Sequence, residues 1–397
     1  MDLLFSYLGL ADFEVLYQVS KELYKLKDSF RRKHLNINTH LRDFVANPEV
    51  FRYQLGKYDA LISGGFALNF FELGRWKVPN LDILIRAGNN ADEFEKHIRD
   101  QEGYETDSND NPEVETEEGR RIFSSSTRPG MELRVIRTNG PPIQAILTSS
   151  YTTASVNFIT WNKAYSIFPV QTVIQHRFYP LKPLDDDFGS VLNELGNQGW
   201  TTRDVIWPDL AADVQVRKIH RFRRVGDRSS LVIPLSIINV PQASTPDFVI
   251  EYAQLEVITE LPNVPRAGRH GFQQGPFQQG AFNPFQQNQP RRNQFPWIQC
   301  HGLSSPALRH EYTLASESWR NYVMERLRRW AWVELHKVEP GKRPEQFING
   351  IPHHSDISLP EEFQVPKTWD YADDQIPEWY REWEQMKAES GASRFRQ

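Results

Sequence analysis

A pair of glycines followed by one carboxylate is the part of this sequence best suited to chemistry. Residues 61–85 read LISGGFALNFFELGRWKVPNLDILI. Free N–H groups at a helix start, and the absence of Cβ atoms, let a phosphate group approach the backbone at such a turn. A carboxylate on the next strand could hold a divalent ion that bridges the phosphates. The spacing predicts a nucleotide site at Ser63, Gly64, Gly65, Asn80 and Asp82, with Asp82 as the metal ligand.

The same residues also have structural explanations. Two glycines permit a helix to pack closely against a strand. A lone aspartate such as Asp82 also serves as a cap or as an ordinary surface residue. Both alternatives stay open at the level of the sequence.

The segment SGGFALNFF followed by NLDILI resembles the signature of the nucleotidyltransferase superfamily. In that superfamily a Gly-Gly or Gly-Ser turn precedes a helix and a strand carrying Asp-x-Asp, and a later strand supplies a third acid. The resemblance extends from Ala60 to Pro169. The order of ISGGFALNFFE, LDI and VNFITWNKAYSIFP also resembles a group of fungal proteins of unassigned function. This resemblance implies an α+β fold with a mixed sheet and helices on one side.

The sequence departs from the catalytic pattern at the acids. Asn80 stands where the first acid is expected, and fourteen residues separate it from Gly65. The segment Pro142–Leu147 is predicted to be the strand of the third acid, where Gln144 stands instead. Glu132 in MELRVIR could restore a carboxylate if that strand faces Asp82.

These substitutions bear on the predicted activity. Two-metal phosphoryl transfer needs several carboxylates around Mg²⁺. We therefore predict a non-enzymatic interaction protein without a cofactor. The alternatives are a transferase that uses Mg²⁺ with a nucleoside triphosphate, and a nucleotide sensor without turnover.

The N-terminal residues suggest a second function. The segment LLFSYLGLADFEVLYQVSKELYKL has apolar residues at three- and four-residue steps, which predicts helices. FSYL, ADFEVL and VSKELYKL resemble an F-box, a helical module that docks into the linker protein of a cullin ubiquitin ligase. The resemblance implies a docking face at Leu4, Phe5, Leu8, Phe13, Leu16 and Val19. The alternative is that these side chains pack onto the domain that follows.

Composition and residue patterns divide the chain into five predicted regions. They are an F-box-like segment (1–50), a nucleotidyltransferase-like core (51–200), a strand-rich continuation (201–261), a Phe/Gln/Pro-rich disordered linker (262–296) and a helical C-terminal region (297–397). Within the core we expect a helix at Ala91–Tyr104, a solvated acidic loop at 101–118, and a turn at Asn162. Strands at Met131–Arg137 and Ile143–Thr148 are predicted to form a hairpin.

Composition limits the compartment and the partners. The formal net charge of −5 argues against a globally basic nucleic-acid-binding protein. Cys300 is the single cysteine, which excludes an intramolecular disulfide and fits a reducing cytoplasmic or nuclear compartment. No stretch approaches the roughly 18 apolar residues that suggest a membrane span. We expect neither a membrane partner nor a signal peptide.

Overall fold

A computed structural model of the chain describes residues 8–25, 27–106, 119–200, 219, 222–258, 296–352, 357–360 and 362–394. The predicted docking residues Leu4 and Phe5 lie outside this part of the chain. So do the centre of the acidic loop (107–118) and nearly all of the predicted linker (262–295).

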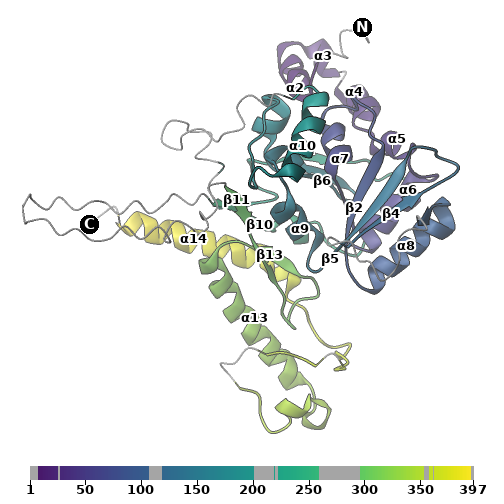
Figure 1. Cartoon of the computed structure of the whole chain (residues 1–397). Coiled ribbons are helices and arrows are strands. Elements are labelled where there is room, and N and C mark those ends of the chain that lie inside the picture. The colour runs from purple at the N-terminus through teal and green to yellow at the C-terminus, as the bar shows by residue number, and fades with distance from the viewer. Residues whose placement is uncertain are drawn as a thin grey trace, which may run out of the picture.

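The central element is a mixed sheet of eight strands in the order β3-β4-β5-β2-β1-β6-β7-β9 (Figure 1). Neighbouring strands are antiparallel, except that β2 and β5 run parallel. The strands are β1 (Leu61–Ser63), β2 (Asn80–Arg86), β3 (Glu105–Thr106), β4 (Arg120–Ser124), β5 (Glu132–Thr138), β6 (Asn157–Ile159), β7 (Lys163–Ser166) and β9 (Leu231–Pro234). The expected α+β class with a mixed sheet is confirmed.

Helices pack on both faces of this sheet, and not on one face as predicted. One face packs against α5 (Ile37–Leu41), α6 (Pro48–Lys57), α7 (Gly64–Phe71) and α8 (Asn89–Glu102). Side chains of β2 alternate between the faces, so Ile83 joins the core under α8 while Leu84 faces the other side. Helix α9 (Pro142–Ser149) covers that second face.

Helix α9 corrects the predicted hairpin. Residues 143–148 form a helix and not a strand, because Pro142 starts the helix and Ile143, Ile146 and Leu147 follow a helical spacing. These three side chains are buried against the sheet. Gln144 is therefore a helix residue, and the third-acid strand is not at 143–148.

Other predicted elements are confirmed. Helix α8 spans most of the predicted range Ala91–Tyr104, and β5 nearly coincides with Met131–Arg137. Strands β6 and β7 are antiparallel partners on either side of Asn162. Short helical turns η1 (Thr153–Ser155) and η2 (Val170–Ile174) follow α9 and β7 in the chain, and α10 (Asp186–Asn197) comes next.

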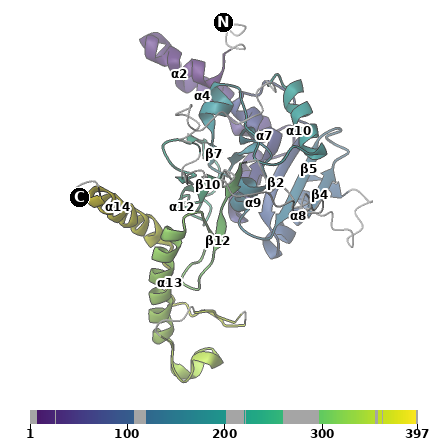
Figure 2. The ribbon, with the colours of Figure 1, turned by 60° about the vertical axis from the view of Figure 1, so that its left-hand side comes forward.

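The N-terminal helices are α2 (Leu10–Val19), α3 (Lys21–Lys25) and α4 (Lys27–His34). Leu10 is buried in the main core, and the Phe13 ring lies 3.7 Å from the Phe30 ring between centroids. These helices and α13 (Glu317–Lys337) lie at opposite ends of the molecule in two views (Figures 1 and 2).

The C-terminal region has a core of its own. Trp319, Leu327, Tyr380 and Trp383 belong to this core, which joins α13 to α14 (Ile376–Arg394). The remaining strands and helices are β8 (Arg223–Arg224), α12 (Phe248–Glu251), β10 (Gln254–Ile258), β11 (Trp297–Gln299), β12 (His301–Leu303), β13 (Tyr312–Leu314), η4 (Pro340–Lys342), η5 (Glu345–Phe347) and η6 (Asp373–Gln375). Among the described residues, no helix combines the length and apolar character needed to cross a membrane.

Candidate phosphate-binding site

The Gly-Gly turn and the Asp82 strand are brought together by antiparallel pairing of β1 with β2. Ser63 and Asp82 are direct register partners, and α7 starts at Gly64. Gly64 has φ +70°, a conformation that glycine adopts without the strain of a Cβ atom. A Cβ atom there would lie 2.2 Å from Oδ2 of Asp82. The glycine is therefore needed both for the backbone conformation and for the approach of the carboxylate.

Strand β5 places a cation beside this carboxylate. Asp82 and Arg134 are register partners on the parallel strands β2 and β5, while Asn80 is paired with Glu132. The carboxylate of Glu132 accepts hydrogen bonds from Arg134, from Nη2 at 2.8 Å and from Nε at 3.1 Å. Glu132 therefore lies on the strand beside Asp82, as proposed from sequence, but its charge is paired with Arg134.

The environment of Asp82 acts on its proton affinity in opposite directions. Burial raises the pKa of Asp82 above its ordinary value, and Glu194 adds to this effect. Arg134, Arg120 and a hydrogen bond from Asn80 lower the pKa and offset part of the rise. Asn80 thus supports the charged form of Asp82 through a hydrogen bond.

These residues line a cavity of about 730 Å³. Its cationic lining residues are Arg120 from β4, Arg134 and Arg137 from β5, and Lys182, whose Nζ lies 4.3 Å from the Tyr151 ring centroid. Gln144 from α9 and Glu194 from α10 also line it. A Cβ atom on Gly65 would lie 3.6 Å from Oε1 of Glu194, so this carboxylate sits over the start of α7.

The side chains around Asp82 do not fit a site in which carboxylates hold a magnesium ion. Asp82 is accompanied by Arg134 and Arg120, whose charges oppose the approach of a cation. No group of three or more His, Cys, Asp or Glu side chains suited to a metal occurs within the part of the chain that the structure describes. The cavity instead combines cationic side chains with backbone N–H groups at a helix start, which suits an anion.

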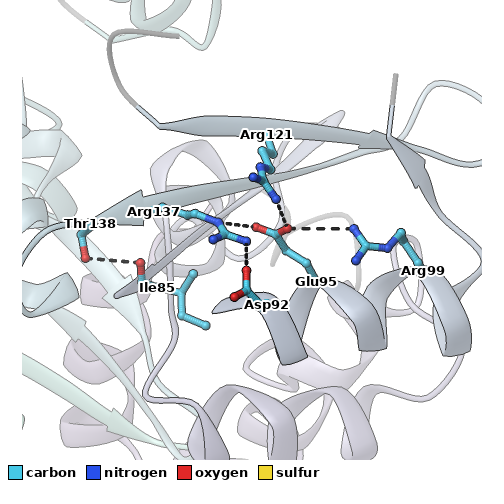
Figure 3. A network of polar contacts seen from close by, with 7 residues as sticks. All are labelled: Ile85, Asp92, Glu95, Arg99, Arg121, Arg137 and Thr138. Carbon is cyan, nitrogen blue, oxygen red and sulfur yellow. Dashed lines mark hydrogen bonds and ion pairs between the residues drawn. The ribbon is translucent and has the colours of Figure 1, made fainter. Parts of the chain in front are cut away.

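A buried ion network holds β4 and β5 against α8 (Figure 3). Glu95 is 1% exposed, and its Oε1 and Oε2 accept hydrogen bonds from Arg137 Nε at 2.7 Å and from Arg121 Nη1 at 2.6 Å. Arg137 also donates to Asp92 at 2.7 Å. Residues of one strand alternate between faces, so this network fixes the strands that present Arg120 and Arg134 to the cavity on the other face.

The predicted docking residues on α2 have different environments. Phe13 is buried against Phe30, so it packs inside the chain and not on an outward face as expected. Leu8 and Leu16 are partly exposed. Val19 is 76% exposed, and its neighbour one turn earlier, Val15, is 60% exposed.

Sequence reasoning missed the cationic residues of the cavity. Arg120, Arg134 and Lys182 come from separate segments, and no local spacing connects them to Asp82. One of these residues could have been found from the sequence. In a strand with the sequence MELRVIR, alternate side chains share a face, so Arg134 lies on the same face as Glu132.

No protein-family model and no curated protein matches the chain. Among solved structures the chain is similar to a chain of "The complex structure of CCA-adding enzyme with CTP", at 17% identity and a TM-score of 0.23. That match covers 31% of this chain and 28% of the other.

Proposed function

We propose that the cavity at the Gly64–Gly65 turn binds a phosphate-bearing ligand, such as a nucleoside triphosphate, through arginines and without metal-dependent turnover. The observation that carries this proposal is the pairing of Arg134 with Asp82 on adjacent strands. Arg134 donates to Glu132 through Nε and Nη2, so its remaining guanidinium N–H groups would bind the phosphate oxygens.

The rest of the cavity supports the same class of ligand. Its volume of about 730 Å³ falls in the range of roughly 300–1,000 Å³ that is usual for small-molecule sites. Arg120 and Lys182 add positive charge, and Asn139 and Gln144 supply amides that can bind a sugar or a base. The turn, helix and strand follow the order of the nucleotidyltransferase signature, and the carboxylates of that signature are largely replaced.

A thermal-shift titration tests this function. The purified chain is titrated with ATP, GTP, CTP and UTP, in EDTA and in Mg²⁺. We expect at least one nucleotide to raise Tm in EDTA, because a ligand that binds only the folded state stabilises it. The shift should be lost in Arg134→Met and kept in Arg320→Met, a matched change on the exposed surface of α13.

Two results would count against the proposal. Absence of a shift with every nucleotide would leave the Gly-Gly turn as a packing feature. A shift that requires Mg²⁺, together with transfer of label to an acceptor that Asp82→Ala abolishes, would instead favour the nucleotidyltransferase alternative.

A second candidate function is that of an adaptor whose α2 helix docks a cullin-ligase linker protein. The observation in its favour is that Val15 and Val19 are 60% and 76% exposed at positions one helical turn apart. Such a pair is a typical anchor for a helix-in-groove interface. The phosphate-binding cavity would then be the ligand-responsive part of the adaptor.

Co-purification with the linker protein tests the adaptor. Val19→Asp should abolish binding, because it places a charge in an apolar interface. Val333→Asp, at a residue of α13 that is 47% exposed, is the matched control and should bind normally. Equal recovery of the linker protein with both variants, or none with the unaltered chain, would reject docking through α2.

A further inference from the structure

A second cavity, of about 710 Å³, lies among the N-terminal helices, η2 and β9. Its walls come from α2 and α4 on the N-terminal side, from the chain at Phe168–Ile174, and from the edge strand β9. It shares no lining residue with the cavity at Asp82. The nucleotide proposal does not use it, and the docking proposal shares only Val15 with it.

The walls of this cavity are apolar and partly open to solvent. Leu10, Leu35, Phe168, Val173 and Ile233 form its buried part. At its rim, Val15 of α2 is 60% exposed and Ile174 of η2 is 56% exposed. Large aliphatic side chains from two separate elements therefore border one concave surface, and water is an unfavourable occupant of such a surface.

The charged residues of this cavity all have the same sign. Arg31, Arg223 and Arg228 line it, and no Asp or Glu does so among the described residues. Arg223 is 7% exposed and is fully engaged, since it donates to Asp227, Ser230 and the Ile167 carbonyl. Its guanidinium therefore has a structural role.

Arg31 and Arg228 differ from Arg223. Both are exposed, and within the described part of the chain neither makes an ion pair. The cavity thus has an apolar interior with two available guanidinium groups on its border. This is the complement of a molecule with an apolar chain and an anionic end.

We propose that this cavity binds a single-chain amphiphile with an anionic head group, such as a long-chain carboxylate. The apolar chain lies against Val15, Val173 and Ile174, and the head group pairs with Arg31 and Arg228. Gln171, Ser229 and Ser230 add hydrogen-bonding groups to the lining beside these arginines. A carboxylate and a phosphate monoester share the required charge, and the experiment distinguishes them.

Calorimetric titration of the full chain, below the critical micelle concentration, tests the site. The probes are dodecanoate, dodecyl phosphate and the uncharged dodecanol. We expect saturable one-to-one binding of at least one anionic probe, and at least tenfold weaker binding of dodecanol. In a series of chain lengths the affinity should rise roughly fourfold per methylene until the cavity is filled. A preference between the two anionic probes identifies the head group.

Variants locate the binding. Arg31→Glu combined with Arg228→Glu should weaken the anionic probe at least tenfold and leave dodecanol unchanged. Ile174→Asp should weaken the binding of the anionic probes and of dodecanol. Arg320→Glu and Val333→Asp, on the exposed surface of α13, are the matched controls and should bind as the unaltered chain does.

The proposal is overturned by any of three results. These are no saturable binding of either anion, equal affinity for dodecanol and the anions, and binding that Ile174→Asp leaves unchanged. Because Ile174 is exposed, its variant should fold, and a thermal unfolding curve confirms this. The chain-length series on the unaltered protein gives a second, independent check.

Discussion

Asp82 and Arg134 occupy directly paired positions on adjacent parallel strands, so a partly buried carboxylate and a guanidinium share one cavity wall. In a carboxylate-based metal centre the neighbouring strand would add negative charge. Here it adds an Arg134–Glu132 ion pair, and Arg134 partly offsets the rise in the pKa of Asp82 that burial causes. This arrangement supports the proposed binding of an anion in the cavity.

Gly64→Ala should destabilise the protein more than an ordinary glycine substitution. The left-handed conformation by itself costs about 1–2 kcal/mol for a residue with a Cβ atom. At Gly64, that atom would also lie 2.2 Å from the Asp82 carboxylate, so we expect a total loss above about 3 kcal/mol in urea unfolding.

Gly130→Ala is the control for this substitution. Gly130 has φ +77°, and nothing lies within 4 Å of its added Cβ atom, so this variant isolates the backbone strain. In an Asp82→Ala background, the cost of Gly64→Ala should fall toward that of Gly130→Ala. An unchanged cost in that background would show that the carboxylate does not cause the destabilisation.

Glu194→Gln should increase the affinity for a phosphate-bearing ligand several-fold. The Glu194 carboxylate lies over Gly65 and raises the pKa of Asp82, so it repels an incoming anion. Binding is measured by calorimetry with ATP in EDTA. Asp187→Asn in the first turn of the same helix is the control and should leave the affinity unchanged. Weaker binding by Glu194→Gln would mean that this residue contacts the ligand favourably.

Glu95→Ala should be strongly destabilising, by about 3–5 kcal/mol, because it leaves Arg137 and Arg121 without their buried partner. Asp92→Ala removes another acid of the same network (Figure 3). The Asp92 side chain is 60% exposed, so its loss should cost less than about 1 kcal/mol. Chemical denaturation measures the unfolding free energy of both variants. Equal losses of stability would contradict the argument that burial makes Glu95 more important than Asp92.

Glu72 gives the protein a pH-dependent stability of predictable sign. Its side chain is 3% exposed, and burial raises its pKa to about 7, although Arg75 opposes this rise. The folded state then binds the proton more tightly than the unfolded state. The stabilisation is complete below the ordinary pKa of about 4.5 and is lost as pH rises through 7.

The difference in unfolding free energy between the unaltered chain and Glu72→Gln isolates this effect. It should fall by roughly 3 kcal/mol between pH 4 and pH 8. His176 lies 3.4 Å from Glu72, and burial lowers its pKa, which acts in the opposite direction as pH falls. His176 is present in both proteins, so its contribution largely cancels. A difference that does not change with pH would contradict the raised pKa of Glu72.

Local patterns were sufficient for part of this structure. Four elements were predicted because each follows from residue spacing within one short segment. They are the Gly-Gly turn with its helix, strand β2 with Asp82, helix α8 and the turn at Asn162. The segment at 143–148 was mistaken for a strand because its short apolar run fits both periods. The two prolines before it favoured the helix.

The sequence by itself determined that Gly64, Gly65 and Asp82 lie on a turn, a helix and a strand in succession, because these are local consequences of backbone sterics and side-chain alternation. Only the tertiary structure decided what faces Asp82. Arg134 is fifty-two positions away and reaches it through parallel pairing of β2 with β5, while Glu194 and Lys182 arrive from beyond the sheet. Long-range strand pairing depends on burial of the whole sheet, and no spacing within a short segment encodes it.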